Sequence, residues 1–88
     1  MKHLVRIPSP LRSYTAGAAQ TYASGDTLTE LLADLESAHP GMCFRIIDEQ
    51  QRIRPHIRLF INTREVSSLG AALAARDEVH VICALSGG

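Results

Sequence analysis

SGDTLTELLADLESAHPG, residues 24–41, has the pattern of one amphipathic helix. Four leucines recur at the spacing that places side chains on a single helix face: Leu28, Leu31, Leu32 and Leu35. Such a helix has about three turns, and its apolar face must be buried against another element. We therefore expect a sheet to cover these leucines and to form the core with them.

Both ends of this helix carry the expected signals. Thr27 and Glu30 have the spacing of a capping box, and Asp26 is the alternative cap. His39-Pro40-Gly41 ends the pattern, because proline and glycine both disfavour continuation of a helix.

Two strands are predicted before the helix. His3–Ile7 alternates apolar and polar residues and ends at Pro8-Ser9-Pro10, because proline cannot donate to a central ladder. Leu11–Gly17 is predicted to be a turn region. Ala19–Ala23 is then a second strand that pairs back on the first as a hairpin.

The segments after the helix are less regular. Met42–Ile47 is short and apolar, which is typical of a loop that packs under a sheet. Asp48–Arg54 is polar and predicts an exposed loop. Leu69–Ala75 is predicted to form one helical turn.

Three more strands complete the predicted sheet. In the first, Ile57, Leu59 and Ile61 alternate with His56, Arg58 and Phe60, which indicates one buried face. A turn at Asn62–Glu65 leads to a short strand at Glu65–Val66. The last strand, Glu78–Ala84, places Val79, Val81 and Cys83 on one face and His80, Ile82 and Ala84 on the other.

Two strands, a helix and three strands form the order of an α+β protein with the β-grasp (ubiquitin-like) architecture. We expect a mixed sheet of four to five strands wrapped around one main helix, with the last strand central and parallel to the first. Residues 1–84 would form this domain, and residues 85–88 a flexible C-terminal tail that ends Gly-Gly.

Composition excludes several classes of function. Nine basic and nine acidic residues cancel, and no basic stripe indicates nucleic-acid binding. The beginning of the chain lacks the long apolar run of a signal peptide or membrane span, so we expect a cytoplasmic protein. No enzyme is expected either, because the sequence offers no catalytic residues: no activated nucleophile, base or phosphate-binding glycine loop stands out.

Cysteine and histidine usage predicts no metal site. Cys43 and Cys83 are too few for a disulfide framework and are expected to be free thiols, most often buried. The four histidines lack metal-ligand spacing and are expected at the surface or at edges: His3, His39, His56 and His80.

The chemistry of the chain is expected at its C-terminal segment, Leu85-Ser86-Gly87-Gly88. Five residues from Ala84 onward span at most about 17 Å, enough to thread a carboxylate into the pocket of a partner. Glycine suits a narrow channel because it has no side chain. A carboxylate is a poor electrophile, but activation as an acyl-adenylate would permit attack by sulfur to give a thiocarboxylate.

Several motifs along the chain resemble those of one family. They are Ser24-Gly25-Asp26-Thr27-Leu28, Asp34-Leu35-Glu36 with Pro40-Gly41, Phe60-Ile61-Asn62 with Glu65-Val66, Asp77-Glu78-Val79, and Ser86-Gly87-Gly88. The whole chain resembles the ThiS/MoaD/CysO family of ubiquitin-like sulfur carriers. The helix entry and the long loop before the third strand resemble the CysO-like branch most.

This resemblance implies a carrier that binds no cofactor of its own. An activating enzyme of the ubiquitin-activating type would use ATP to adenylate Gly88, which would then become a thiocarboxylate. The tail Ser86-Gly87-Gly88 would thread into the partner. In the CysO-like branch the sulfur acceptor is an activated serine bound to a PLP-dependent cysteine synthase, and a metalloprotease releases the product. Molybdopterin and thiamin synthesis are the alternative pathways.

A partner interface is expected beside the tail, at Phe60, Ile82 and Leu85. Phe60 and Ile82 fall on the strand faces opposite the core, so an exposed apolar patch results if their strands are neighbours. The family presents an interface residue at the position of Ile82. The alternative is that the loop Asp48–Arg54 covers both side chains.

Two other functions remain open at this point. The chain would be a protein modifier if Gly88 became linked to lysines of target proteins, since this route shares the activated intermediate. It would be a simple β-grasp binding module if deletion of Gly87 and Gly88 left partner binding and the cellular phenotype unchanged.

Overall fold

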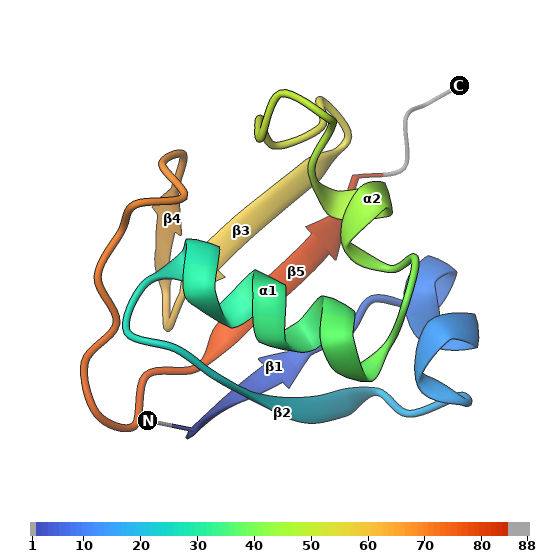
Figure 1. Ribbon diagram of the computed structural model, residues 1–88, viewed down its shortest axis with the longest axis horizontal. Helices are drawn as coiled ribbons and strands as arrows, with labels where there is room; N and C mark the ends of the chain where they lie inside the picture. The colour runs from blue at the N-terminus through green and yellow to red at the C-terminus, as the bar shows by residue number, and fades with distance from the viewer. Residues whose placement is uncertain (1, 85–88) are drawn as a thin grey trace.

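The computed structural model describes residues 2–84, and its centre is a five-stranded mixed sheet with one long helix packed across one face (Figure 1). The strand order is β2-β1-β5-β3-β4. The elements are β1 (Lys2–Arg6), the 3-10 helix η1 (Ser9–Thr15), β2 (Gln20–Ser24), α1 (Leu28–Ala38), α2 (Cys43–Ile46), β3 (Ile57–Ile61), β4 (Arg64–Val66) and β5 (Val79–Cys83). The predicted β-grasp fold is confirmed.

The last strand occupies the middle of the sheet, as predicted. β5 runs parallel to β1 and antiparallel to β3, with Val5 opposite Val79 and Leu59 opposite Val81. The buried side chains of these strands point toward α1, because alternate residues of a strand face opposite sides of the sheet. The hairpin of β1 and β2 is also confirmed, with Leu4 opposite Tyr22.

Helix α1 begins where its capping signals predict. The hydroxyl oxygen of Thr27 accepts from the backbone N–H of Glu30 at 3.3 Å, and the Glu30 carboxylate accepts from the N–H of Asp26 at 2.8 Å. Gly25 is required before this cap, since a Cβ there would lie 2.5 Å from the backbone nitrogen of Leu31. The four predicted leucines are all buried against the sheet.

Two segments that were predicted as irregular are helical. The turn region predicted at Leu11–Gly17 is largely the 3-10 helix η1, which buries Leu11. The loop predicted at Met42–Ile47 contains α2, whose side chains Cys43 and Ile46 are buried. Both helices are shorter than the window in which periodicity can be recognised, so the sequence pattern did not reveal them.

The helical turn predicted at Leu69–Ala75 is wrong. This segment is extended enough for Ala72 to form an isolated bridge with Thr27, and the N–H of Leu73 donates to the carbonyl of Asp26 at 2.9 Å. Buried Leu73 anchors it on the core. Hydrogen bonds to the start of α1 therefore replace those that a local helix would supply.

The prediction of four peripheral histidines is wrong for His3, whose side chain is only 1% exposed. Its two ring nitrogens lie 2.9 Å from the carbonyl oxygen of Asp77 and 3.1 Å from that of Gly25. Burial is tolerated because the ring N–H has a carbonyl acceptor in either tautomer. None of the helices in this described part of the chain is long and apolar enough to cross a membrane.

Candidate functional site

The structure positions the strand that precedes the predicted carrier segment. Leu85, Ser86, Gly87 and Gly88 lie outside the described residues, and so does the predicted tail 85–88 as a whole. The described chain is held to the sheet up to its last residue, because the N–H of Ala84 donates to the carbonyl of His56 at 2.8 Å. Residues after Ala84 therefore start from a fixed point at the end of the central strand.

Phe60 and Ile82 lie on the face of the sheet opposite α1, on neighbouring strands. Phe60 stands opposite His80 and Ile82 opposite Arg58, so the two apolar residues are diagonal neighbours on one face. Ile82 is 44% exposed and Phe60 is half-buried. The loop Asp48–Arg54 thus does not cover Ile82, and an accessible apolar position stands two residues before the end of the described chain.

Sequence reasoning missed two further side chains of this face. Leu4 and Tyr22 stand opposite each other on β1 and β2 and alternate with buried neighbours, so both point away from α1. Tyr22 is 58% exposed. The strand alternation contained this information, but the hairpin register was needed to place the two residues together. We call the surface of Leu4, Tyr22, Phe60, His80 and Ile82 the open face.

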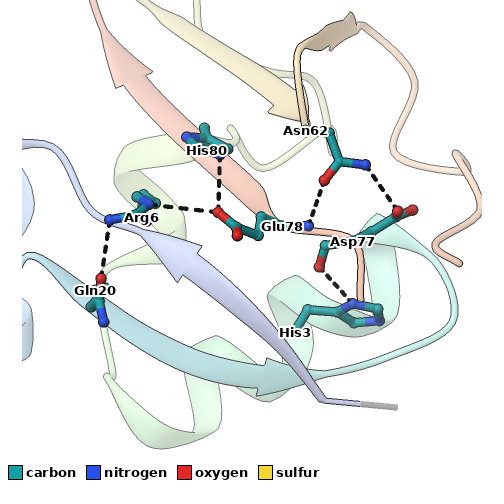
Figure 2. Close-up of polar contacts among 7 residues, drawn as sticks. All are labelled: His3, Arg6, Gln20, Asn62, Asp77, Glu78 and His80. Atoms are coloured by element: carbon teal, nitrogen blue, oxygen red, sulfur yellow. Dashed lines mark hydrogen bonds and ion pairs between the residues drawn. The ribbon is translucent and has the colours of Figure 1, made fainter. Parts of the chain in front are cut away.

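Charges are paired across the open face. The Glu78 carboxylate lies 3.7 Å from Arg6 Nε and 3.5 Å from His80 Nε2, and it links β1 to β5 (Figure 2). At the other edge, Arg58 and Glu65 form an ion pair at 2.9 Å. These exposed pairs contribute little to stability, so their main effect is to give the face a charge pattern around its apolar positions.

The beginning of β5 is held by a polar network (Figure 2). The Asn62 side chain donates to the Asp77 carboxylate at 2.9 Å and accepts from the N–H of Glu78 at 3.0 Å. The same carboxylate accepts from the N–H of Ala74 at 2.8 Å. Hydrogen bonds from Ala74 and then from Asn62 lower the pKa of Asp77 below its usual value. Together with His3, this network fixes the register at which the central strand starts.

Neither thiol is prepared for nucleophilic chemistry. Burial, followed by the charge of Glu36, raises the pKa of Cys43 to about 12, and its Sγ–H donates to the carbonyl of Leu32 at 3.0 Å. Partial burial also raises the pKa of Cys83. The thiolate is the reactive form of cysteine, so both residues are held in the unreactive form. Among residues 2–84, no three ligating side chains lie close enough together to bind a metal ion.

Comparison with known proteins identifies close similarity over the whole chain. The model of the ThiS family matches residues 5–88. The sulfur carrier protein CysO of Mycobacterium tuberculosis is 33% identical over 93 aligned positions that cover all of both chains.

Solved structures agree with this match. The crystal structure of Mycobacterium tuberculosis CysO superposes with a TM-score of 0.88 at 31% identity, covering 93% of this chain and 98% of the other. The Amycolatopsis orientalis BexX/CysO complex contains a chain that matches with a TM-score of 0.89 at 31% identity, covering 97% and 98%. SAMP1 from Haloferax volcanii matches with a TM-score of 0.83 at 26% identity, covering both chains fully. The chain therefore belongs to the ThiS family.

Proposed function

We propose that this protein is a sulfur carrier, and that Gly88 holds the transferred sulfur as a thiocarboxylate. The observation that carries the proposal is the similarity to CysO over the whole of both chains, together with a family match that extends through Gly88. The fold supports it, because the central strand β5 leads directly to this segment.

The reaction needs an activating enzyme and ATP. A carboxylate oxygen of Gly88 attacks the α-phosphorus of ATP, which forms an acyl-adenylate and releases pyrophosphate. A sulfide sulfur then attacks the acyl carbon, the carbon–sulfur bond forms, and AMP leaves. We propose an adenylating enzyme of the ubiquitin-activating type for the first step. The carrier contributes an accessible carboxylate and a docking surface, and ATP binds to its partner.

The sulfur acceptor is a second partner. Similarity to CysO favours a PLP-dependent cysteine synthase, with a metalloprotease as a possible third partner that releases the product. A molybdopterin or thiamin pathway is the alternative. The complex of BexX with CysO supports the general arrangement, in which CysO assembles with a second protein.

Docking on these partners is proposed to use the open face and the tail together. Phe60 and Ile82 supply apolar contact beside the strand end, and Leu85 would continue it. Ser86, Gly87 and Gly88 would enter the active site of the partner. The chain acts as a protein cosubstrate in this scheme.

The test is intact-mass measurement of untagged protein incubated with a cognate activating enzyme, ATP and sulfide. We expect a species heavier by the mass difference between sulfur and oxygen, and we expect its absence in a variant that lacks Gly88. Unmodified protein under complete conditions would refute the carrier function.

A protein modifier is the second candidate. The likeness to SAMP1, the small archaeal modifier protein 1, favours it. In that case a lysine amine attacks the same acyl-adenylate, an isopeptide bond forms and AMP leaves. Conjugates on cellular proteins that depend on Gly88 would support this function, whereas a mass gain confined to the free chain supports sulfur transfer.

A further inference from the structure

A concave surface lies on the α1 side of the sheet, opposite the open face. It is a cleft of about 330 Å³ between α1, α2 and the loop that follows α2. In Figure 1, α2 lies beside α1, and the loop continues from the end of α2. The floor of the cleft, as we use the word, is the apolar part of its lining: Leu32, Ala33, Ile47 and Leu69. The volume is at the lower end of the range for binding pockets, so it admits one or two side chains.

An exposed aromatic ring forms one wall of the cleft. Phe44 is 58% exposed, whereas two other residues of α2, Cys43 and Ile46, are buried. The Arg54 guanidinium lies 4.6 Å from the ring centroid, and its Nε donates to the Phe44 carbonyl at 2.6 Å. The ring is therefore held in place at the cleft although the fold does not bury it. Aromatic side chains of this kind often dominate binding energy at interfaces.

All charged residues that line the cleft are acidic: Glu36, Asp48 and Glu49. The Glu36 carboxylate accepts from the N–H groups of Gly41 at 2.7 Å and Cys43 at 3.1 Å, which fixes its position. The N–H groups of Arg52 and Gln50 donate to Asp48, and the first of these bonds contributes most to lowering its pKa. Glu36 and Asp48 are thus fixed in position, and with the exposed Glu49 they form a negative rim beside apolar side chains.

Arg52 and Arg54 lie near the cleft and offset part of the negative charge of Asp48 through their electrostatic interaction with it. Arg54 is engaged with Phe44, and Arg52 donates to the Gln50 side chain. Neither arginine lines the cleft. The thiol of Cys43 does line it, but its pKa of about 12 excludes a covalent role near neutral pH. The arrangement is suited to binding and not to chemistry.

We propose that this cleft docks a basic amphipathic segment of a partner protein. One or two bulky apolar side chains would contact Phe44 and the floor, and flanking lysine or arginine side chains would face Glu36, Asp48 and Glu49. Charge complementarity selects this partner, because an acidic or neutral segment would leave the rim unpaired. The open face lies on the other side of the sheet, so both surfaces can be occupied at once. The inference does not depend on the chemistry of Gly88.

The test is an NMR titration of the isotope-labelled protein with two helical peptides of about twelve residues. Both carry leucine at positions i, i+3, i+4 and i+7, with lysine in one and glutamate in the other at every polar position. We expect the lysine peptide to shift the amide signals of α1, α2 and the loop 47–51, and the glutamate peptide to shift none. Absence of shifts with the lysine peptide, equal binding of both peptides, or shifts spread over all acidic residues would overturn the proposal.

Three variants locate the site. Phe44→Ala should weaken binding of the lysine peptide about tenfold, as expected for an aromatic anchor. Glu49→Lys should weaken it as well, and the exposed position of Glu49 lets the fold tolerate this substitution. Tyr22→Ala is the matched control, since Tyr22 has the same exposed fraction of 58% as Phe44 but lies on the open face. Equal loss in the Tyr22 and Phe44 variants would place the site elsewhere.

Discussion

The buried ring of His3 joins three segments that are distant in sequence. It belongs to β1 and contacts the carbonyl of Gly25 before α1 and that of Asp77 before β5. A neutral imidazole has one N–H, so which oxygen it donates to depends on the tautomer. Whatever the tautomer, removal of the ring leaves a space in the core and takes the N–H donor away from one of the two carbonyls.

We expect His3→Ala to lower the free energy of unfolding by about 2–4 kcal/mol, from lost packing and an unsatisfied polar group. Urea denaturation followed by circular dichroism measures this effect. His56→Ala is the control, because His56 is exposed and should change the value by less than about 0.5 kcal/mol. Equal effects of the two substitutions would show that the His3 contacts do not stabilise the fold.

Asp77 makes stability depend on pH in a defined direction. Its pKa is lowered in the folded state, mainly by the hydrogen bond from the N–H of Ala74, so the ionised carboxylate favours folding. This contribution is complete above the unfolded pKa of about 3.9 and is lost as pH falls through the lower folded pKa. Asp77→Asn should therefore be less stable than the native chain near neutral pH.

The measurement is the urea midpoint of both proteins from pH 7 down to pH 3. We expect the two midpoints to converge as pH falls below about 4, where the unfolded carboxyl becomes protonated. A constant separation over the whole range would contradict the assigned role of the carboxylate.

At the scale of elements, α1 depends on the cap that the sequence predicts. Thr27→Ala removes the acceptor of the Glu30 N–H and should lower the free energy of unfolding by about 1 kcal/mol. Thr27→Ser should retain most of the native stability, because serine also supplies a hydroxyl oxygen as the acceptor. Ser37→Ala is the control on the exposed side of the same helix. The prediction fails if Thr27→Ala and Ser37→Ala have the same effect on the urea midpoint.

At the scale of the whole molecule, the open face and the cleft lie on two sides of one sheet. Ile82→Lys should leave the fold intact, because the side chain is 44% exposed. It should raise the KM of the activating enzyme for the carrier about tenfold, as expected for loss of an apolar contact at an interface. Steady-state pyrophosphate release measures this.

Ser37→Ala serves as the control for this experiment, because Ser37 is exposed on α1, lies outside the cleft and should leave that KM unchanged. If Ile82→Lys also leaves it unchanged, the open face is not the surface that the activating enzyme binds.

Much of this architecture was predictable from local pattern. Strong periodicity marked α1, β3 and β5, and alternation placed Phe60 and Ile82 away from the core. The short helices η1 and α2 and the extended segment around Leu73 were not predicted. Their conformations depend on contacts with distant residues, and a few residues of local sequence carry too little periodic signal to show this.

The sequence by itself determined the leucine face of α1, its cap, the central strand and the family to which the chain belongs, because each depends on residues close together in the chain or on motifs. Only the tertiary structure decided that His3 is buried, that Leu4 and Tyr22 share a face with Ile82, and that Phe44 borders an acidic cleft. The physical reason is that burial and surface charge depend on which segments pack together, and here those segments are separated by tens of residues.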